Sequence, residues 1–269
     1  NANFSLTIRT PDGTGSGYAA GDFNDVSKLK TGALTDIAIQ KARASQKAVA
    51  LEPGKYTVIL EPLAAGELIQ FMMRAMDART ADEGRSFLSK KGGGTRLGEK
   101  LLDERVTIYS DPTDSQVPSS PFSGDGYPYE KVVWFDKGVV KNMSYSPYWA
   151  KQKGVKPLPE PSGFVMEGGT QSLADMIKGT EKGILVTRFW YTRWLDPQTL
   201  LYTGLTRDGT FYIDNGQIKH PIKNFRFNES PVIMLNNLEA IGIPERTRGC
   251  MVPPLRIRDF TFSSLSDAV

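Results

Sequence analysis

Residues 56–76, YTVILEPLAAGELIQFMMRAM, join one strand to one helix and decide the fold. Tyr56–Glu61 is rich in β-branched and aromatic side chains, which favour a strand. Pro62 follows at a position where a helix can start, because the first helical turn does not need its N–H. The apolar residues then recur at three- and four-residue steps, which predicts a helix with one buried face: Ala65, Leu68, Ile69, Met72, Met73 and Met76. A dimer surface is a second interpretation of its methionines, because Met suits adaptable interfaces.

The residues before this pair are predicted to form a separate strand–helix segment over 1–50. Phe4–Ile8 alternates apolar and polar side chains, as a half-buried strand does. A turn and a glycine-rich connection up to Gly21 follow, and Val26–Ser45 has the periodicity of an amphipathic helix. We expect this segment to be a bridge from a missing N-terminal domain or the tail of one. The chain also opens at Asn1 without Met, which suggests a fragment or a processed product.

Residues 51–269 contain many strand-like segments and few helical ones, which predicts an α+β domain built on a large, curved antiparallel sheet. Ile184–Leu195 (ILVTRFWYTRWL) is apolar on both faces apart from Thr and Arg, so it is predicted to be a strand covered on both sides. Ser230-Pro231 predicts a helix start, and Gly242 the end of that helix. The alternation in Leu255–Phe262 predicts a closing strand.

Composition excludes several classes of function. The 269 residues carry a net charge of +3, with Lys and Arg mixed among Asp and Glu, so no direct nucleic-acid contact is expected. No apolar run is long enough to span a membrane, and no membrane partner is expected. The single cysteine, Cys250, cannot form an intrachain disulfide, which fits a reducing compartment and a cytoplasmic location.

Few side chains offer catalytic chemistry. His220 is the one histidine, so a His-pair metal site is impossible within this chain, and its place after Asn215-Gly216 favours an ordinary hairpin residue. Cys250 is a possible thiol nucleophile, because nearby arginines could stabilise a thiolate, but a packing role is the simpler interpretation. Arg188 and Arg193 lie among aromatic residues and are expected to pair with carboxylates or stack on rings.

An ordered set of segments resembles the C-terminal domain of the TldD/PmbA family, which is also named for modulation of DNA gyrase. The segments are, in chain order, Thr10–Gly17 (TPDGTGSG), Leu51–Leu60 (LEPGKYTVIL), Lys182–Gly209 with its ending TGLTRDG, Asp214–Ile218 (DNGQI), Asn224–Ser230 (NFRFNES) and Glu239–Gly242 (EAIG). Members of this family are longer by roughly one N-terminal domain. The resemblance implies a relation to metallopeptidases and proteolysis.

In the peptidase branch of the family, as the resemblance implies, the helix after the YTVIL-like strand carries His-Glu-x-x-x-His. Two imidazoles bind zinc there, and the Glu activates the metal-bound water. The three matching positions in this chain are Gln70, Phe71 and Ala75, which resembles the PmbA (TldE) branch without the zinc motif. We therefore expect no catalytic residue and no metal here, and zinc only in a TldD-like partner.

That branch also supplies a Cys ligand near its C-terminus, followed by a glycine-rich insertion. Cys250 lies in the same neighbourhood, but only Met251–Pro254 separate it from the last strand. The ligand role is therefore not carried over to Cys250. Whether the chain has any enzymatic activity alone stays open.

The resemblance implies a non-catalytic subunit or homologue of a TldD-type metallopeptidase. It would pair with a TldD-like subunit or with itself as a dimer, and would bind peptide or unfolded protein substrates for proteolysis or maturation. Strand addition at a sheet edge is one expected mode of peptide recognition. Two alternatives stay open: a homodimeric binding or scaffold protein without a peptidase partner, and a hydrolase with non-zinc chemistry.

Overall fold

The strand–helix pair of residues 56–76 lies at the centre of the computed structural model, which describes residues 2–266. Asn1 and residues 267–269, the outer ends of the two predicted segments, lie outside the described part. Strand β3 (Gly54–Leu60) leads through an extended Glu61 into helix α2 (Pro62–Arg74), with Pro62 in its first turn as predicted. The last three residues of β3 are fully buried.

A large curled sheet forms one side of the molecule and confirms the predicted α+β class. Its strand order is β12-β11-β8-β3-β17-β13-β10-β9, and β14 pairs with β17 outside this path. The pairing is antiparallel except between β3 and β8, which run parallel, so the sheet is mixed where the sequence predicted an antiparallel one. Its remaining strands are β8 (Lys182–Val186), β9 (Phe189–Asp196), β10 (Leu201–Thr206), β11 (Thr210–Asp214), β12 (Gln217–Pro221), β13 (Phe225–Glu229), β14 (Leu238–Ile241) and β17 (Leu255–Leu265).

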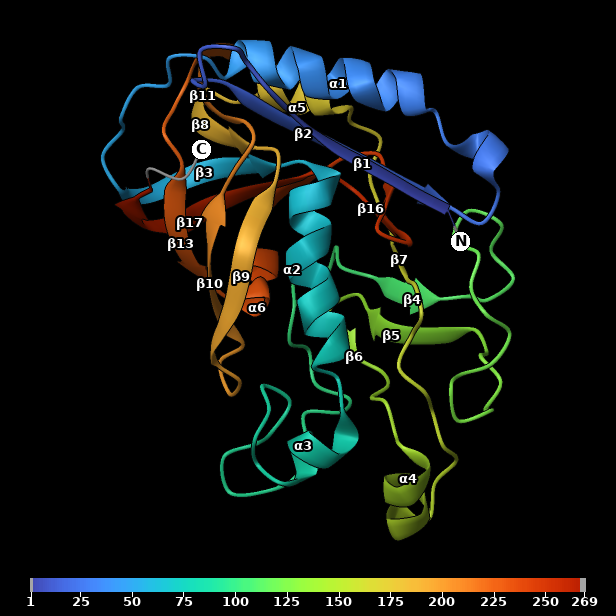
Figure 1. Ribbon diagram of the computed structural model, residues 1–269. Helices are drawn as coiled ribbons and strands as arrows, with labels where there is room; N and C mark the ends of the chain where they lie inside the picture. The colour runs from blue at the N-terminus through green and yellow to red at the C-terminus, as the bar shows by residue number, and fades with distance from the viewer. Residues whose placement is uncertain (1, 267–269) are drawn as a thin grey trace.

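A smaller sheet stands on the other side of α2, so that the helix runs between the two sheets (Figure 1). Its strand order is β15-β16-β7-β4-β5-β6. These strands are β4 (Ile108–Ser110), β5 (Val132–Asp136), β6 (Val139–Val140), β7 (Val165–Met166), β15 (Glu245–Thr247) and β16 (Cys250–Val252). One apolar core cluster includes side chains of α2 and of both sheets, for example Leu68, Ile108 and Phe260, so the sheets and the helix fold as one body.

The short helices begin where the sequence offers caps. Ser172 and Asp175 form the reciprocal capping box at the start of α5 (Leu173–Lys178). Ser230 caps α6 (Pro231–Asn236), but this helix ends before the predicted stop at Gly242, because Leu238 already belongs to strand β14. The two others are α3 (Ala78–Asp82) and α4 (Pro147–Lys153). No helix within residues 2–266 is long and apolar enough to cross a membrane.

The predicted strand Ile184–Leu195 is in fact two strands with different environments. In β8, Gly183–Val186 are buried, as the apolar sequence predicted. The prediction is wrong for β9, where Trp190, Tyr191, Trp194 and Leu195 are exposed. The sequence of an apolar strand does not show whether its side chains are buried in a sheet interior or form an exposed apolar patch, which explains the error.

The N-terminal segment contains one strand more than predicted. Strands β1 (Ala2–Arg9) and β2 (Ser16–Phe23) form an antiparallel hairpin, and a 3₁₀ turn at Val26–Lys28 separates it from helix α1 (Thr31–Ala44). The glycine-rich stretch predicted as a connection is therefore a strand. Its glycines allow close packing on α1, because a Cβ at Gly17 would lie 2.1 Å from the Ala38 carbonyl oxygen.

This contact predicts that Gly17→Ala destabilises the protein. The added methyl group must push α1 away from β2, and we expect a loss of about 1–3 kcal/mol in the free energy of unfolding. Urea denaturation followed by circular dichroism measures the change. Gly32→Ala is the matched control, because a Cβ there meets nothing within 4 Å. Equal stability of the two variants would contradict the close-packing account.

Candidate functional site

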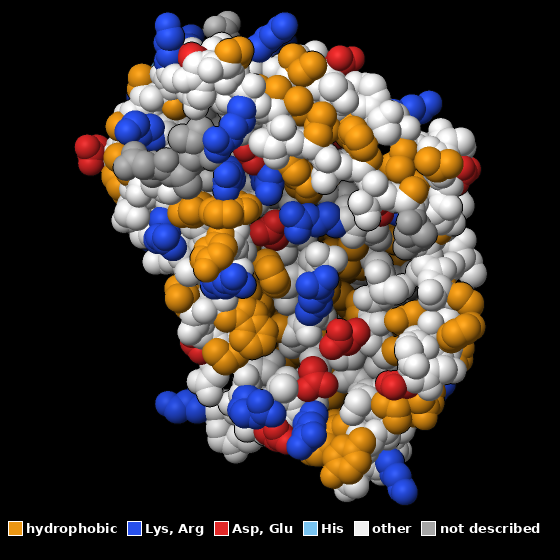
Figure 2. Space-filling view, in the orientation of Figure 1, with side chains coloured by type: hydrophobic (Ala, Val, Ile, Leu, Met, Phe, Trp, Pro, Cys, Tyr) orange, Lys and Arg blue, Asp and Glu red, His pale blue; other side chains and the backbone are white. Residues whose placement is uncertain are grey.

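Helix α2 buries most of its surface and leaves a narrow exposed stripe. Residues three and four positions apart share a helix face, and along this stripe lie the partly exposed Gln70 and Phe71 and the exposed Arg74, with the buried Glu67 at its inner end. Figure 2 shows the region of α2 as a hollow with basic and acidic side chains along it, and with hydrophobic side chains gathered on the rim near β9. The stripe contains two of the three degenerate zinc-helix positions and is the candidate site.

The structure separates the degenerate positions from one another. Phe71 stacks on Tyr202 of β10, with ring centroids 4.9 Å apart, and Ala75 packs against the same core. Gln70 instead faces the small sheet and lines a cavity of about 70 Å³ together with Cys250 and Arg74. The cavity is completed by Met73 and by the segment Glu160–Phe164. The helix and the C-terminal cysteine, which are far apart in sequence, therefore meet.

These donors do not suit zinc. Structural and catalytic zinc sites use imidazole, thiolate and carboxylate ligands. An amide stands at position 70, a benzyl group at 71 and a methyl group at 75. Within residues 2–266, no group of three or more His, Cys, Asp or Glu side chains is placed to hold a metal ion.

Cys250 is a buried packing residue with 3% of its surface exposed. Burial raises the pKa of its thiol to about 11, and this effect exceeds the opposing influence of Arg246 and Arg74. Arg248, two residues before Cys250, is directed elsewhere, because it pairs with Glu67. The thiol is therefore protonated at neutral pH, and the interpretation of Cys250 as an activated nucleophile is not supported.

Glu67 carries a carboxylate on the stripe of α2, and it is held from two sides. Its Oε1 accepts a hydrogen bond of 2.6 Å from the Thr192 hydroxyl on β9. Its Oε2 lies 2.9 Å from a guanidinium nitrogen of Arg248, in the turn between β15 and β16. The side chain of Glu67 is 8% exposed and that of Arg248 is 40% exposed. Glu67 thus links α2 to both sheets, because Thr192 belongs to the large sheet and Arg248 to the small one.

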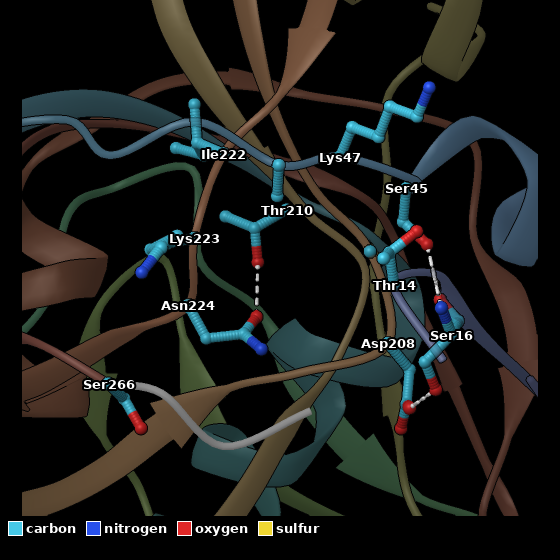
Figure 3. A pocket seen from close by; sticks show the side chains of 12 residues that line it. Thr14, Ser16, Ser45, Lys47, Asp208, Thr210, Ile222, Lys223, Asn224 and Ser266 are labelled. Atoms are coloured by element: carbon cyan, nitrogen blue, oxygen red, sulfur yellow. Dashed lines mark hydrogen bonds between the residues drawn. The ribbon is translucent and has the colours of Figure 1, made fainter. Parts of the chain in front are cut away.

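A second cavity, of about 250 Å³, lies between the N-terminal segment and the large sheet (Figure 3). Asp208, in the TGLTRDG segment, is buried on its wall with a positive φ of 56°. Its carboxylate accepts a hydrogen bond from Ser16 and pairs with Arg188 at 2.6 Å. Arg188 also lies over the ring of Tyr18, 3.8 Å from its centroid. This segment of the resemblance therefore anchors the hairpin β1–β2 to the sheet.

Other predicted residues have structural surroundings. Arg193 stacks on Tyr191 at 4.4 Å, so the predicted ring stacking is confirmed for both arginines. His220 belongs to the β11–β12 hairpin and stacks on Tyr212. The prediction of an ordinary hairpin residue is therefore confirmed.

Comparison with known proteins assigns the framework. Residues 53–264 match the profile of a family described as the PmbA/TldA metallopeptidase C-terminal domain. The chain belongs to the PmbA/TldD family. An uncharacterized protein of Methanocaldococcus jannaschii is 30% identical over 86% of this chain and 54% of its own length. A protein of Methanothermobacter thermautotrophicus named metalloprotease is 24% identical over 74% of this chain and 47% of its own. The chain thus spans about half the length of these curated relatives.

Solved structures of PmbA/TldD relatives share the fold. A Bacteroides thetaiotaomicron protein named for modulation of DNA gyrase superposes with a TM-score of 0.82 and 26% identity, over 98% of this chain and 59% of that one. TldE of Thermococcus kodakarensis superposes with a TM-score of 0.82 and 18% identity, over 97% of this chain and 62% of that one. At 18% identity the likeness to TldE shows the fold alone.

Two residues that line these cavities were not predicted from the sequence. Glu160 lies in a proline-rich connection and gave no signal that it would meet α2. Asp208 lies in the TGLTRDG segment, where Gly209 marks a turn. The sequence pattern does not show that the Asp208 side chain is buried. Both depend on contacts between segments that are distant in sequence.

The raised pKa of Cys250 predicts slow alkylation. At pH 8, a thiol of pKa about 11 is ionised roughly 100-fold less than one of pKa 9, and burial slows the reaction further. We expect the native protein to resist iodoacetamide and the urea-unfolded protein to react at one thiol per chain, as measured by mass spectrometry. Rapid alkylation of the native chain would contradict a buried, protonated thiol.

The Glu67–Arg248 ion pair predicts that removal of the arginine lowers the free energy of unfolding. Arg248→Met leaves the Glu67 carboxylate buried without its partner, and we expect a loss of about 1–2 kcal/mol, because the arginine is partly exposed. Glu67→Gln in the same chain should restore part of this loss in urea titrations. The matched control is Arg79→Met, which breaks the exposed Arg79–Glu83 pair and should cost less than about 0.5 kcal/mol. Equal losses in the two single variants would contradict the account.

Proposed function

We propose that this chain is a non-catalytic, TldE-like homologue of a TldD-type metallopeptidase, which binds peptide or unfolded protein substrates. One observation carries the proposal: helix α2 keeps its place between the sheets, while the positions that match the zinc motif are Gln70, Phe71 and Ala75. The metallopeptidase framework is therefore present with side chains that cannot bind zinc. Membership of the PmbA/TldD family and the shared fold with TldE support the same function.

The free edge of the large sheet supports peptide binding. Strand β9 ends the sheet, and β10 is its one strand partner among residues 2–266. Its unpaired backbone groups can hydrogen-bond an extended peptide. Trp190, Tyr191 and Trp194 are 37%, 58% and 62% exposed beside this edge. Arg207 stacks on Trp190 and Arg193 stacks on Tyr191, which favours fixed orientations of these two rings.

The exposed apolar side chains on β9 also suit a protein partner. Contiguous aromatic side chains are unusual on the surface of a monomer and are common in the centre of an interface. A TldD-like subunit would supply the zinc that this chain cannot hold. A homodimer without a peptidase partner would use the same surface, and the two assemblies differ in metal content.

The proposal predicts that zinc follows the partner. The isolated chain should contain almost no zinc after purification, and co-expression with a TldD-like relative should yield a complex with about one zinc per pair. Elemental analysis and size-exclusion chromatography measure the two quantities. Stoichiometric zinc in the isolated chain would refute the non-catalytic assignment. A zinc-free homodimer that ignores the relative would favour the scaffold alternative.

A further inference from the structure

The cavity next to Gln70 has a lining of unusual chemistry for a metallopeptidase relative. In the peptidase branch, this face of the helix would hold a zinc cation. Here the helix contributes the amide of Gln70 and the guanidinium of Arg74 to the cavity lining, and Cys250 of β16 lines the same cavity. The positive charge of Arg74 in this lining favours an anionic ligand beside it.

Arg74 is available to a ligand. It lies in the last turn of α2, it is exposed, and its side chain makes no hydrogen bond or ion pair with any residue in the range 2–266. The Gln70 side chain has no such partner within this range either. By contrast, Arg248 and Arg246 are committed to Glu67 and Asp22. Gln70 and Arg74 are four residues apart and therefore share one face of α2. Both side chains line the same small cavity.

The walls of the cavity strengthen any ion pair formed inside it. Met73 and Phe164 are each 2% exposed and give the cavity an apolar base. An ion pair beside apolar walls is screened less than one in open water. The volume of about 70 Å³ corresponds to only a few water molecules, which suits a planar carboxylate rather than a whole side chain with its backbone.

One group opposes an anion in this cavity. Glu160 lines the same cavity as Arg74. The pKa of its carboxyl is raised, first by loss of hydration and then by the Asp77 carboxylate, whereas Arg74 lowers it. No ion pair joins Glu160 to Arg74 within the described residues. Glu160 therefore weakens the binding of a ligand carboxylate by charge repulsion, but it does not itself pair with Arg74.

We propose that this cavity binds a peptide carboxylate, with Arg74 as the charged donor and Gln70 as the neutral donor. Of the three positions that match the zinc motif, Gln70 is the one that lines this cavity. The free C-terminus of a peptide is the ligand that we favour. The identity of the ligand rests on the proposed peptide binding, whereas the charge preference of the cavity does not.

Three short probes test the pocket on the full chain. They are acetyl-Ala-Ala-Ala with a free carboxylate, the same peptide as its amide, and acetyl-Ala-Asp-Ala amide. Chemical shifts of the arginine Nε–Hε groups follow binding in protein labelled with ¹⁵N-arginine. We expect the free carboxylate to shift the Arg74 signal saturably and the neutral amide to leave it unchanged. Binding of the Asp-containing amide alone would assign the site to an acidic side chain instead of a C-terminus.

Variants separate the site from general electrostatic attraction. Arg74→Gln should abolish saturable binding. Glu160→Gln should tighten binding by roughly threefold or more, because it removes a like charge at the rim. Arg79→Gln is the control, since this exposed arginine on α3 pairs with Glu83 outside the cavity. Equal binding of the neutral amide, unchanged binding in Arg74→Gln, or an equal loss in Arg79→Gln would overturn the carboxylate pocket. These binding measurements use this chain alone and do not depend on whether it pairs with a zinc-bearing partner. The carboxylate pocket and the proposed function can therefore be refuted independently.

Discussion

Helix α2 has to bury apolar side chains on both of its flanks, because a β-sheet stands on either side of it. It contacts β3 and β9 of the large sheet and β15 and β16 of the small one. Leu68, Ile69 and Met72 are fully buried, and burial of each such side chain stabilises the fold by about 1.5–3 kcal/mol. The start of the helix is fixed as well, since Pro62 can stand only in the first turn. The positions of both sheets therefore depend on this one helix.

The same constraint leaves the exposed side chains of α2 free to vary. Packing determines the buried flanks of α2, but it places few demands on the exposed stripe between the sheets. Gln70 and Arg74 lie on that stripe, so a change of ligand chemistry there costs little of the core. Phe71 shows the alternative outcome, because its ring has joined the core by stacking on Tyr202. Stability and ligand choice are thus separated along one helix.

Local rules predicted much of this fold from the sequence. The strand before Pro62, the serine cap of α6 and the turn at Asn215-Gly216 all depend on a few adjacent residues, and the structure confirms them. The predictions failed where a residue is used for a contact with a segment that is distant in sequence. The glycines of β2 let α1 approach, which no neighbouring residue reveals. The meeting of Gln70 with Cys250 and Glu160 likewise depends on topology, so the resemblance named the zinc positions but did not show the cavity.

The anchoring of the N-terminal hairpin has a consequence for motion. No buried side chain of the two described core clusters comes from residues 2–50. That segment is held to the rest by polar links instead: Ser16 with Asp208, Asp22 with Arg246, and Lys41 with Glu61. Regions with few apolar contacts open at a lower free energy than the core does. The hairpin and α1 thus form a unit that can exchange its amide hydrogens and detach ahead of global unfolding, and added salt weakens the ion pairs that attach it.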